Sequence, residues 1–180
     1  SLLDGFDYRL ITDSGSSNPF LIGYATAPIV LEEESNNDPD SAQQVAAPCE
    51  YVGQFQTRGD DDWIAFDVEK GEVYWIEVLS QPHGSPADPQ MDIELVTTND
   101  EGEQSVTSLA KQDDNGANIG GQHYKTSTDD PGPYRLTAGN DGRCRIRLRE
   151  LARDIRGDSR FFYRLSIRRA KPDFRLVSIP

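Results

Sequence analysis

The stretch that decides the fold is DWIAFDVEKGEVYWIEVL, residues 62–79. Apolar and polar residues alternate on both sides of a short polar break, which is the period of half-buried β-strands. We predict two strands, 62–68 and 73–79, joined as a hairpin by the loop Glu69-Lys70-Gly71. In such a bulged turn Gly71 takes the left-handed position. The break therefore predicts two adjacent antiparallel strands in one sheet.

The predicted hairpin determines which side chains share a face. The three-residue loop sets Phe66 opposite Tyr74, so that the apolar residues of both strands point into one core. Trp63 and Trp75 then lie diagonally to each other on the face away from the core. An exposed aromatic pair of this kind can stack on sugar rings or on a collagen-like ligand. The alternative is that the N-terminal residues or a neighbouring domain cover the pair.

Further alternating runs indicate more strands. They are separated by clusters of Gly, Pro, Asn and Asp, and helical periodicity is almost absent, which predicts an all-β sandwich or barrel. The arginines of RCRIRLREL form a row along one face of its predicted strand. We interpret this row as an exposed strand face paired with carboxylates; an anion-binding stripe is the alternative. The runs are QMDIELV (90–96), RCRIRLREL (143–151) and FYRLSIRR (162–169).

The two ends of the chain differ from this core. Residues 1–28 are interpreted as the tail of a preceding domain or as extra strands. FDYRLI (6–11) echoes FFYRLSI (161–167), which indicates related modules in tandem in a longer parent protein. Residues 173–180 are interpreted as an exit linker, which leaves 29–172 as the sandwich.

The chain is acidic, with 18 Lys and Arg residues against 31 Asp and Glu residues and a formal net charge of −13. Such a field repels phosphate backbones and anionic lipid heads, so neither nucleic acid nor a membrane is an expected partner. His83 and His123 lie in loop sequence, and there is no G-x-S-x-G motif. We therefore expect no catalytic activity in this domain; the paired acids of a glycoside hydrolase are the alternative.

The chain has two cysteines, Cys49 and Cys144, which are too few for a four-thiolate zinc site. A disulfide between them would stabilise the fold in an oxidising compartment by about 3–5 kcal/mol. Two free thiols are the alternative.

An acidic stretch, LEEESNNDPD (31–40), precedes the predicted strands. In an extended chain alternate residues project the same way, so Glu32, Glu34 and Asn36 would line one side. Such oxygens are ligands for a hard cation such as Ca²⁺, which takes six to eight of them. A solvated linker is the alternative.

A second acidic group, GDDDW (59–63), opens the first predicted strand. Its Asp60 and Asp62 share one face, with Asp61 opposite. If the fold brings the two acidic groups together, they assemble the ligands that a calcium site needs.

These motifs occur in an order that resembles the bacterial pre-peptidase C-terminal domain family. Over roughly residues 29–170 they correspond to the family's acidic entry segment, D-x-D-W/F-x-x-F strand, K-G-x-x-Y hairpin and final Y-x-L strand. The resemblance implies a jelly-roll-like antiparallel β-sandwich of the kind appended to secreted proteases and found in clostridial collagen-binding modules. The segments that carry it are NNDPDSAQQV, GQF, GDDDWIAFDVEKGEVYWIEV, ADPQMDIELV, DDNG and YRLSI.

The resemblance also implies a calcium site. In the collagen-binding members the entry segment and the aspartates that open the D-x-D strand hold the ion. This sequence departs from the pattern at Ser35, where a Pro would stiffen the segment, and at Asn37, where an Asp would raise affinity. Cys144 stands where the family usually has an aromatic residue. Carried over by position, the ligands are Glu32, Glu34, Asn36, Asn37, Asp60 and Asp62.

The expected function is therefore that of a non-catalytic accessory module in a larger bacterial protein, such as a secreted protease. The module would be secreted, periplasmic or on the cell surface, and would space or anchor neighbouring domains, with Ca²⁺ making it rigid. The alternative is a module that binds carbohydrate or a fibrous protein through Trp63 and Trp75.

Overall fold

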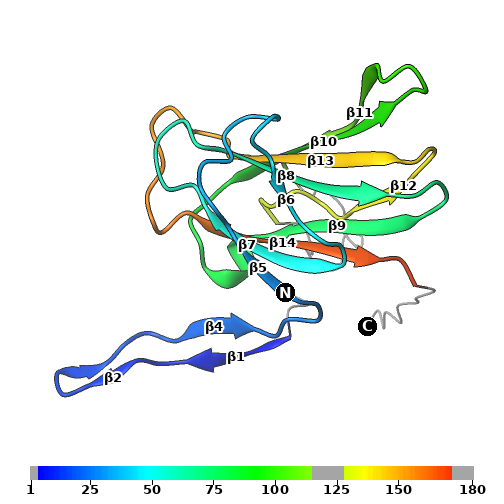
Figure 1. Cartoon of the computed structure of the whole chain (residues 1–180). Coiled ribbons are helices and arrows are strands. Elements are labelled where there is room, and N and C mark those ends of the chain that lie inside the picture. Colours follow the sequence, from blue (N-terminus) through cyan, green and yellow to red (C-terminus); the bar gives the residue numbers. More distant parts are fainter. Residues whose placement is uncertain (1–3, 115–127, 172–180) are drawn as a thin grey trace, which may run out of the picture.

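The computed structural model describes residues 4–114 and 128–171 and consists mainly of two five-stranded sheets packed face to face (Figure 1). The predicted all-β sandwich is confirmed. We name the sheets after one strand of each. The β8 sheet has the order β11-β10-β13-β8-β6 and contains β6 (Gln43–Gln44), β8 (Asp61–Val68), β10 (Pro89–Thr98), β11 (Gln104–Gln112) and β13 (Gly142–Glu150); the β9 sheet has the order β12-β9-β14-β7-β5 and contains β5 (Ile29–Leu31), β7 (Cys49–Gln54), β9 (Val73–Leu79), β12 (Tyr134–Thr137) and β14 (Phe162–Arg169).

Neighbouring strands in both sheets are antiparallel except at two edges. There β5 joins β7, and β6 joins β8, in parallel. The only helix in the described parts of the chain is the short 3₁₀ helix η1 (Gln81–His83). No helix within residues 4–114 and 128–171 has the length and apolar character to cross a membrane.

The hairpin predicted for residues 62–79 is wrong. β8 pairs with β13 and β6, whereas β9 pairs with β14 and β12, so the loop between them crosses from one sheet to the other. The left-handed turn is as predicted, because Gly71 has a φ of +88°. Its N–H donates to the carbonyl of Ala138, 2.8 Å away, outside the two strands. Alternation fixes which side chains point inward, and a hairpin and a crossing between sheets satisfy it equally.

The core lies between the two sheets and contains the apolar side chains that alternation selects. Phe66 of β8 meets Tyr74 of β9 edge to face, with ring centroids 5.3 Å apart. The two residues predicted to be neighbours in one sheet are thus neighbours across the sandwich. Fully buried core residues on β8, β9, β10 and β13 include Ile64, Phe66, Tyr74, Ile76, Met91, Ile93, Ile146 and Leu148.

The cysteines belong to different sheets, and both are free and buried. Cys49 is on β7 and Cys144 is on β13, where each packs in the core. Burial raises the pKa of the Cys49 thiol to about 11 and that of the Cys144 thiol to about 12. Of the two alternatives left by the sequence, the structure has the free thiols.

The arginine row of β13 lies on the outer face of the β8 sheet, and three of its four side chains are paired with acids, as interpreted from the sequence; the fourth, Arg149, donates to the amide oxygen of Gln90 at 2.8 Å. Arg145 lies 2.5 Å from the carboxylate of Glu94, and Arg143 lies 3.1 Å from that of Asp67. Arg147 pairs with the carboxylate of Asp92 on the neighbouring strand β10.

A separate two-stranded ribbon precedes the sandwich and projects away from it (Figure 1). It consists of β1 (Gly5–Tyr8) paired with β4 (Phe20–Gly23), and of β2 (Ile11–Thr12) paired with β3 (Gly15–Ser16) at the tip. The predicted extra segment 1–28 contains this ribbon, but its boundary stays a prediction. The predicted exit linker 173–180 lies outside the described residues.

Because the chain crosses from one sheet to the other between β8 and β9, Phe66 of the β8 sheet packs against the β9 sheet. Replacing Phe66 by Ala should therefore lower the free energy of unfolding by about 3–5 kcal/mol, because it removes an aromatic ring from the closed core. Val106, which is 53% exposed, is the control, and Val106→Ala should change stability by about 0.5 kcal/mol or less. Urea denaturation measures both, and a loss below about 1 kcal/mol for Phe66→Ala would contradict the assignment of this residue to the core.

Candidate metal centre

Backbone hydrogen bonds bring the two acidic groups of the sequence together. The chain leaves the edge strand β5 at Leu31 and passes the beginning of β8. The N–H of Glu32 still donates to the carbonyl of Val52 on β7, 3.0 Å away. Four residues later the carbonyl of Asn36 accepts the N–H of Trp63 on β8, at 2.9 Å. The entry segment, which we define as residues 32–37, is thus tied to both sheets.

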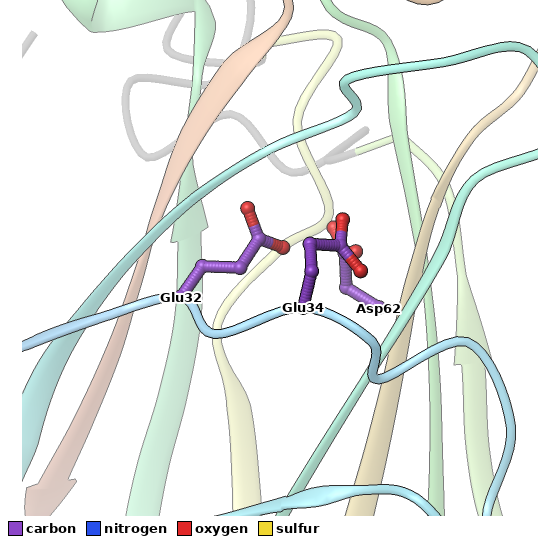
Figure 2. A group of neighbouring side chains, drawn as sticks. All are labelled: Glu32, Glu34 and Asp62. Atoms are coloured by element: carbon purple, nitrogen blue, oxygen red, sulfur yellow. The ribbon is translucent and has the colours of Figure 1, made fainter.

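Three carboxylates converge where the entry segment meets β8. Figure 2 shows Glu32 and Glu34 on the entry segment beside Asp62, the second residue of β8. One oxygen from each lies within 4.8 Å of the others. Oxygens that share one Ca²⁺ at 2.3–2.6 Å are at most about 5 Å apart. The structure therefore gathers three of the six predicted ligands at a spacing that one ion can bridge.

Two buried oxygens at this place have no hydrogen-bond partner among the described residues. They are Oδ1 of Asn36 and Oδ1 of Asp62, and both residues are fully buried. The amide of Asn36 donates instead to Oε1 of Glu32 at 3.5 Å and to the hydroxyl of Tyr51 at 3.3 Å. A buried oxygen without a partner costs about 1–3 kcal/mol, so the fold holds these two groups at an energetic cost.

Burial and mutual repulsion dominate the electrostatics of the cluster. Burial raises the pKa of Asp62 well above its usual range, and the nearby charge of Glu32 raises it further. Burial also raises the pKa of Glu34, followed by the charges of Asp60 and Glu32. Burial is also the main reason that the pKa of Asp60 is raised. Without a cation the site therefore favours bound protons, and a cation would favour the ionised carboxylates.

Asp60 and Asn37, the other two predicted ligands, surround the cluster and make hydrogen bonds of their own. Oδ2 of Asp60 accepts the backbone N–H of Gln56 at 2.5 Å, which holds the turn before β8. Oδ1 of Asn37 accepts the N–H of Asp61 at 3.4 Å, and its amide donates to Oε2 of Glu34 at 3.5 Å. Asn37 therefore orients Glu34, and its role as a ligand stays a prediction, as does that of Asp60.

The site includes residues that the sequence did not single out. The hydroxyl of Tyr163, on β14 of the opposite sheet, donates to Oδ2 of Asp62 at 2.7 Å. A Cβ at Gly53 would lie 2.4 Å from that hydroxyl and 3.2 Å from Oε1 of Glu32, so only Gly fits there. The alternation in the sequence predicts that Tyr163 lies in the core, but it does not predict which group the hydroxyl of Tyr163 contacts. The segment GQF contains Gly53, although nothing local to it indicates a site.

The predicted tryptophan pair does not exist. Trp63 lies on the outer face of the β8 sheet, where the guanidinium groups of Arg145 and Arg147 lie 5.8 and 5.6 Å from its ring centroid. Trp75 belongs to the β9 sheet, opposite Arg135 and Arg168 in the strand register, and faces the other side of the sandwich. The pair depended on the hairpin, and it is lost because β8 and β9 belong to different sheets. A binding role for either residue alone stays a prediction.

No protein-family model matches the chain, and no curated protein matches it. Among solved structures, the chain is similar to the pre-peptidase C-terminal domain of collagenase from Bacillus anthracis, with 15% sequence identity and a TM-score of 0.44. The similarity covers 74% of this chain and 100% of that one. The family resemblance of the sequence therefore stays a prediction, and the case for a site depends on the geometry of this chain.

The raised pKa of Asp62 predicts how the metal-free protein responds to pH. An acid whose pKa is higher in the folded than in the unfolded state stabilises the fold fully below its unfolded value, near 4, and this contribution is lost as the pH rises toward the folded value. The side chain of the Asp62→Asn variant cannot ionise, so the variant does not lose this contribution. Its Tm relative to that of the wild type should therefore rise by several degrees between pH 4.5 and pH 8.

Thermal unfolding in metal-free buffer measures this gain. Asp67 is the matched control, because it is exposed on the same strand β8. The difference between Asp67→Asn and the wild type should stay nearly constant over the same pH range. A constant difference for Asp62→Asn as well would contradict the burial of an ionisable carboxyl group at this position.

Proposed function

We propose that this chain is a non-catalytic accessory β-sandwich module of a larger bacterial protein that is exported or displayed on the cell surface. It spaces or anchors neighbouring domains, and Ca²⁺ makes its entry segment rigid. The observation that carries the calcium proposal is the cluster of Glu32, Glu34 and Asp62 beside the buried, unpartnered Oδ1 atoms of Asn36 and Asp62. The sequence resemblance to the pre-peptidase C-terminal family supports the accessory role.

The donor set favours Ca²⁺ over other common metals. All the candidate ligand atoms are carboxylate or amide oxygens, which suit a hard cation and not zinc, for which nitrogen and sulfur are usual. Mg²⁺ requires short octahedral bonds and gives up its water reluctantly, whereas Ca²⁺ accepts irregular sites that mix carboxylates and amides. Glu34 is exposed and Asp62 is buried, so an ion could enter from the side of the entry segment.

The proposed effect of the ion is mechanical. Glu32 and Glu34 belong to the entry segment, which follows the ribbon in the chain, whereas Asp62 belongs to the sandwich. The strand β5 already pairs residues 29–31 with β7, so an ion shared by the three carboxylates would add a link from this edge of the β9 sheet to β8. Without the ion, repulsion among the carboxylates opposes this contact. Calcium would thus make the connection between the two sheets rigid directly after β5, where the chain enters the sandwich.

Calcium should therefore stabilise the protein against heat. At free Ca²⁺ of 100 times Kd, binding to the folded state alone contributes about 2.7 kcal/mol. For a domain of this size, that shifts Tm by about 5–10 °C. The measurement is thermal unfolding at pH 7.5 in excess EDTA and in millimolar CaCl₂, with MgCl₂ in parallel, where a smaller shift is expected.

Asp62→Asn should abolish the calcium shift while leaving a folded protein, because it removes a ligand charge and keeps the side-chain shape. Asp67→Asn, on the same strand but away from the cluster, should keep the full shift. An equal calcium shift in Asp62→Asn and in the wild type would place the ion elsewhere. No shift in the wild type would make the entry segment a solvated acidic linker.

A second candidate function is the binding of carbohydrate at Trp63 alone. The outer face of the β8 sheet has a hollow of about 240 Å³, large enough for a single sugar ring. Small side chains on β11 leave the space, the tryptophan ring offers an apolar wall, and Oδ1 of Asp92 is buried without a partner among the described residues. Sugar sites combine an aromatic ring with carboxylates in this way. The residues that line the hollow are Trp63, Asp92, Ile93, Glu94, Ser108, Ala110, Lys111 and Arg147.

The two tryptophans provide a matched test of this candidate. If the hollow binds polysaccharide, Trp63→Ala should lose retention in affinity gels that contain soluble glycans, and Trp75→Ala should keep it. The reason is that Trp75 lies on the opposite outer face. Equal loss in both variants, or no retention of the wild type on any polysaccharide, would count against the candidate.

A further inference from the structure

The ribbon before the sandwich carries most of the exposed apolar surface. Nine of the twelve large hydrophobic side chains that are exposed in the described residues lie before residue 32, and seven of these lie in the ribbon and its junction. A two-stranded ribbon is marginally stable in water, whereas three or more strands with an apolar face are stable. The seven are Phe6, Tyr8, Leu10, Ile11, Phe20, Ile22 and Tyr24, which are 38–80% exposed.

The exposed aromatic side chains of the ribbon gather on one face. The register sets Phe6 opposite Ile22 and Tyr8 opposite Phe20, and residues directly opposite in a sheet project to the same side. Tyr24 joins them, because its ring centroid lies 6.0 Å from that of Phe6. Phe20 also packs against Phe162 of β14, with ring centroids 5.8 Å apart. Each of the other half-exposed rings leaves about 100 Å² of surface for a partner to cover.

Within residues 4–114 and 128–171, one edge of the ribbon has no strand paired with it. β4 lies next to η1 of the sandwich, and Pro19, which has no N–H, stands immediately before it. β1 pairs only with β4 in the described part of the chain, and in Figure 1 it is the outer strand of the ribbon. An unpaired edge with apolar neighbours is a template for another strand.

The sequence along this edge is complementary to itself. Antiparallel pairing of two copies centred on Tyr8 places Asp7 of one copy opposite Arg9 of the other, on both sides of the centre. It also places Phe6 opposite Leu10, on the same face as the two Tyr8 rings. Opposite charges and apolar pairs that face each other across strands stabilise a sheet, whereas like charges destabilise it. A two-fold axis satisfies every one of these contacts twice.

We propose that two copies of this chain associate through the outer edges of their β1 strands to form a four-stranded antiparallel sheet, β4-β1-β1-β4. The partner that pairs with the outer edge of the ribbon is thus a second copy of this chain. Two bodies that each carry a formal charge of −13 repel each other, and the ribbon keeps the two sandwiches apart because it projects from the body (Figure 1). The contact is therefore confined to the ribbons.

Sedimentation velocity of the 180-residue protein between about 5 and 500 µM in 0.15 M NaCl tests the proposal. The expected result is a monomer–dimer equilibrium. Asp7→Arg or Arg9→Asp alone sets like charges opposite each other at both pairs, which should weaken the dimer by about fivefold or more. The double variant Asp7→Arg, Arg9→Asp exchanges the charges and should restore the dimer.

The control is Ile155→Ser, which removes an apolar side chain that is 73% exposed and lies outside the ribbon. It should leave the dimerisation constant unchanged. Circular dichroism and Tm establish that each variant is folded, as expected for exposed residues. A monomer at every concentration would overturn the proposal. A dimer that persists in both single variants, or that the double variant fails to restore, would also overturn this pairing.

Discussion

The carboxyl group of Asp62 lies fully buried at the point where the two sheets and the entry segment meet. Alternation along β8 places it on the same inner face as Ile64, so the apolar core ends here in an acid. The opposite sheet supplies the hydroxyl of Tyr163 to one of its oxygens, and Gly53 leaves room for that hydroxyl. The other oxygen has no partner among the described residues. A buried oxygen without a partner costs about 1–3 kcal/mol, so a proton or a cation bound here would stabilise the fold.

The entry segment closes this end of the sandwich because it is attached to both sheets. Its first residue, Glu32, bonds to β7 through its N–H and, through Oε2, accepts the N–H of Gln54 at 2.9 Å. Its carbonyl at Asn36 bonds to β8. These contacts are neutral or charge-assisted hydrogen bonds, but the side chains between them are acids that repel one another. The backbone thus brings the acids together and electrostatics separates them, which makes the segment sensitive to protons and cations.

The sequence predicts the composition of the core better than the connections between strands. Alternation selects Phe66 and Tyr74 as inward residues, and both are buried, yet it cannot tell a hairpin from a crossing between sheets, since inward residues meet in either case. That error separates Trp63 from Trp75, because outward residues of different sheets face opposite ways. Alternation predicts which acids within each acidic group share a face, but only the family resemblance implies that the two groups meet. That meeting and the contribution of Tyr163 depend on packing across the sandwich, which no local pattern contains.

The echo between the two ends of the chain shows how context decides burial. In FFYRLSI, Tyr163 and Leu165 are fully buried, because they lie on the face of β14 that the β8 sheet covers. In FDYRLI, the matching Tyr8 and Leu10 are 48% and 56% exposed, because they belong to a two-stranded ribbon that has no second sheet over it among the described residues. The same pattern of residues has equal capacity to pack in both places. Its burial at one end and exposure at the other therefore reflect whether a second sheet covers the strand, and not what the strand itself prefers.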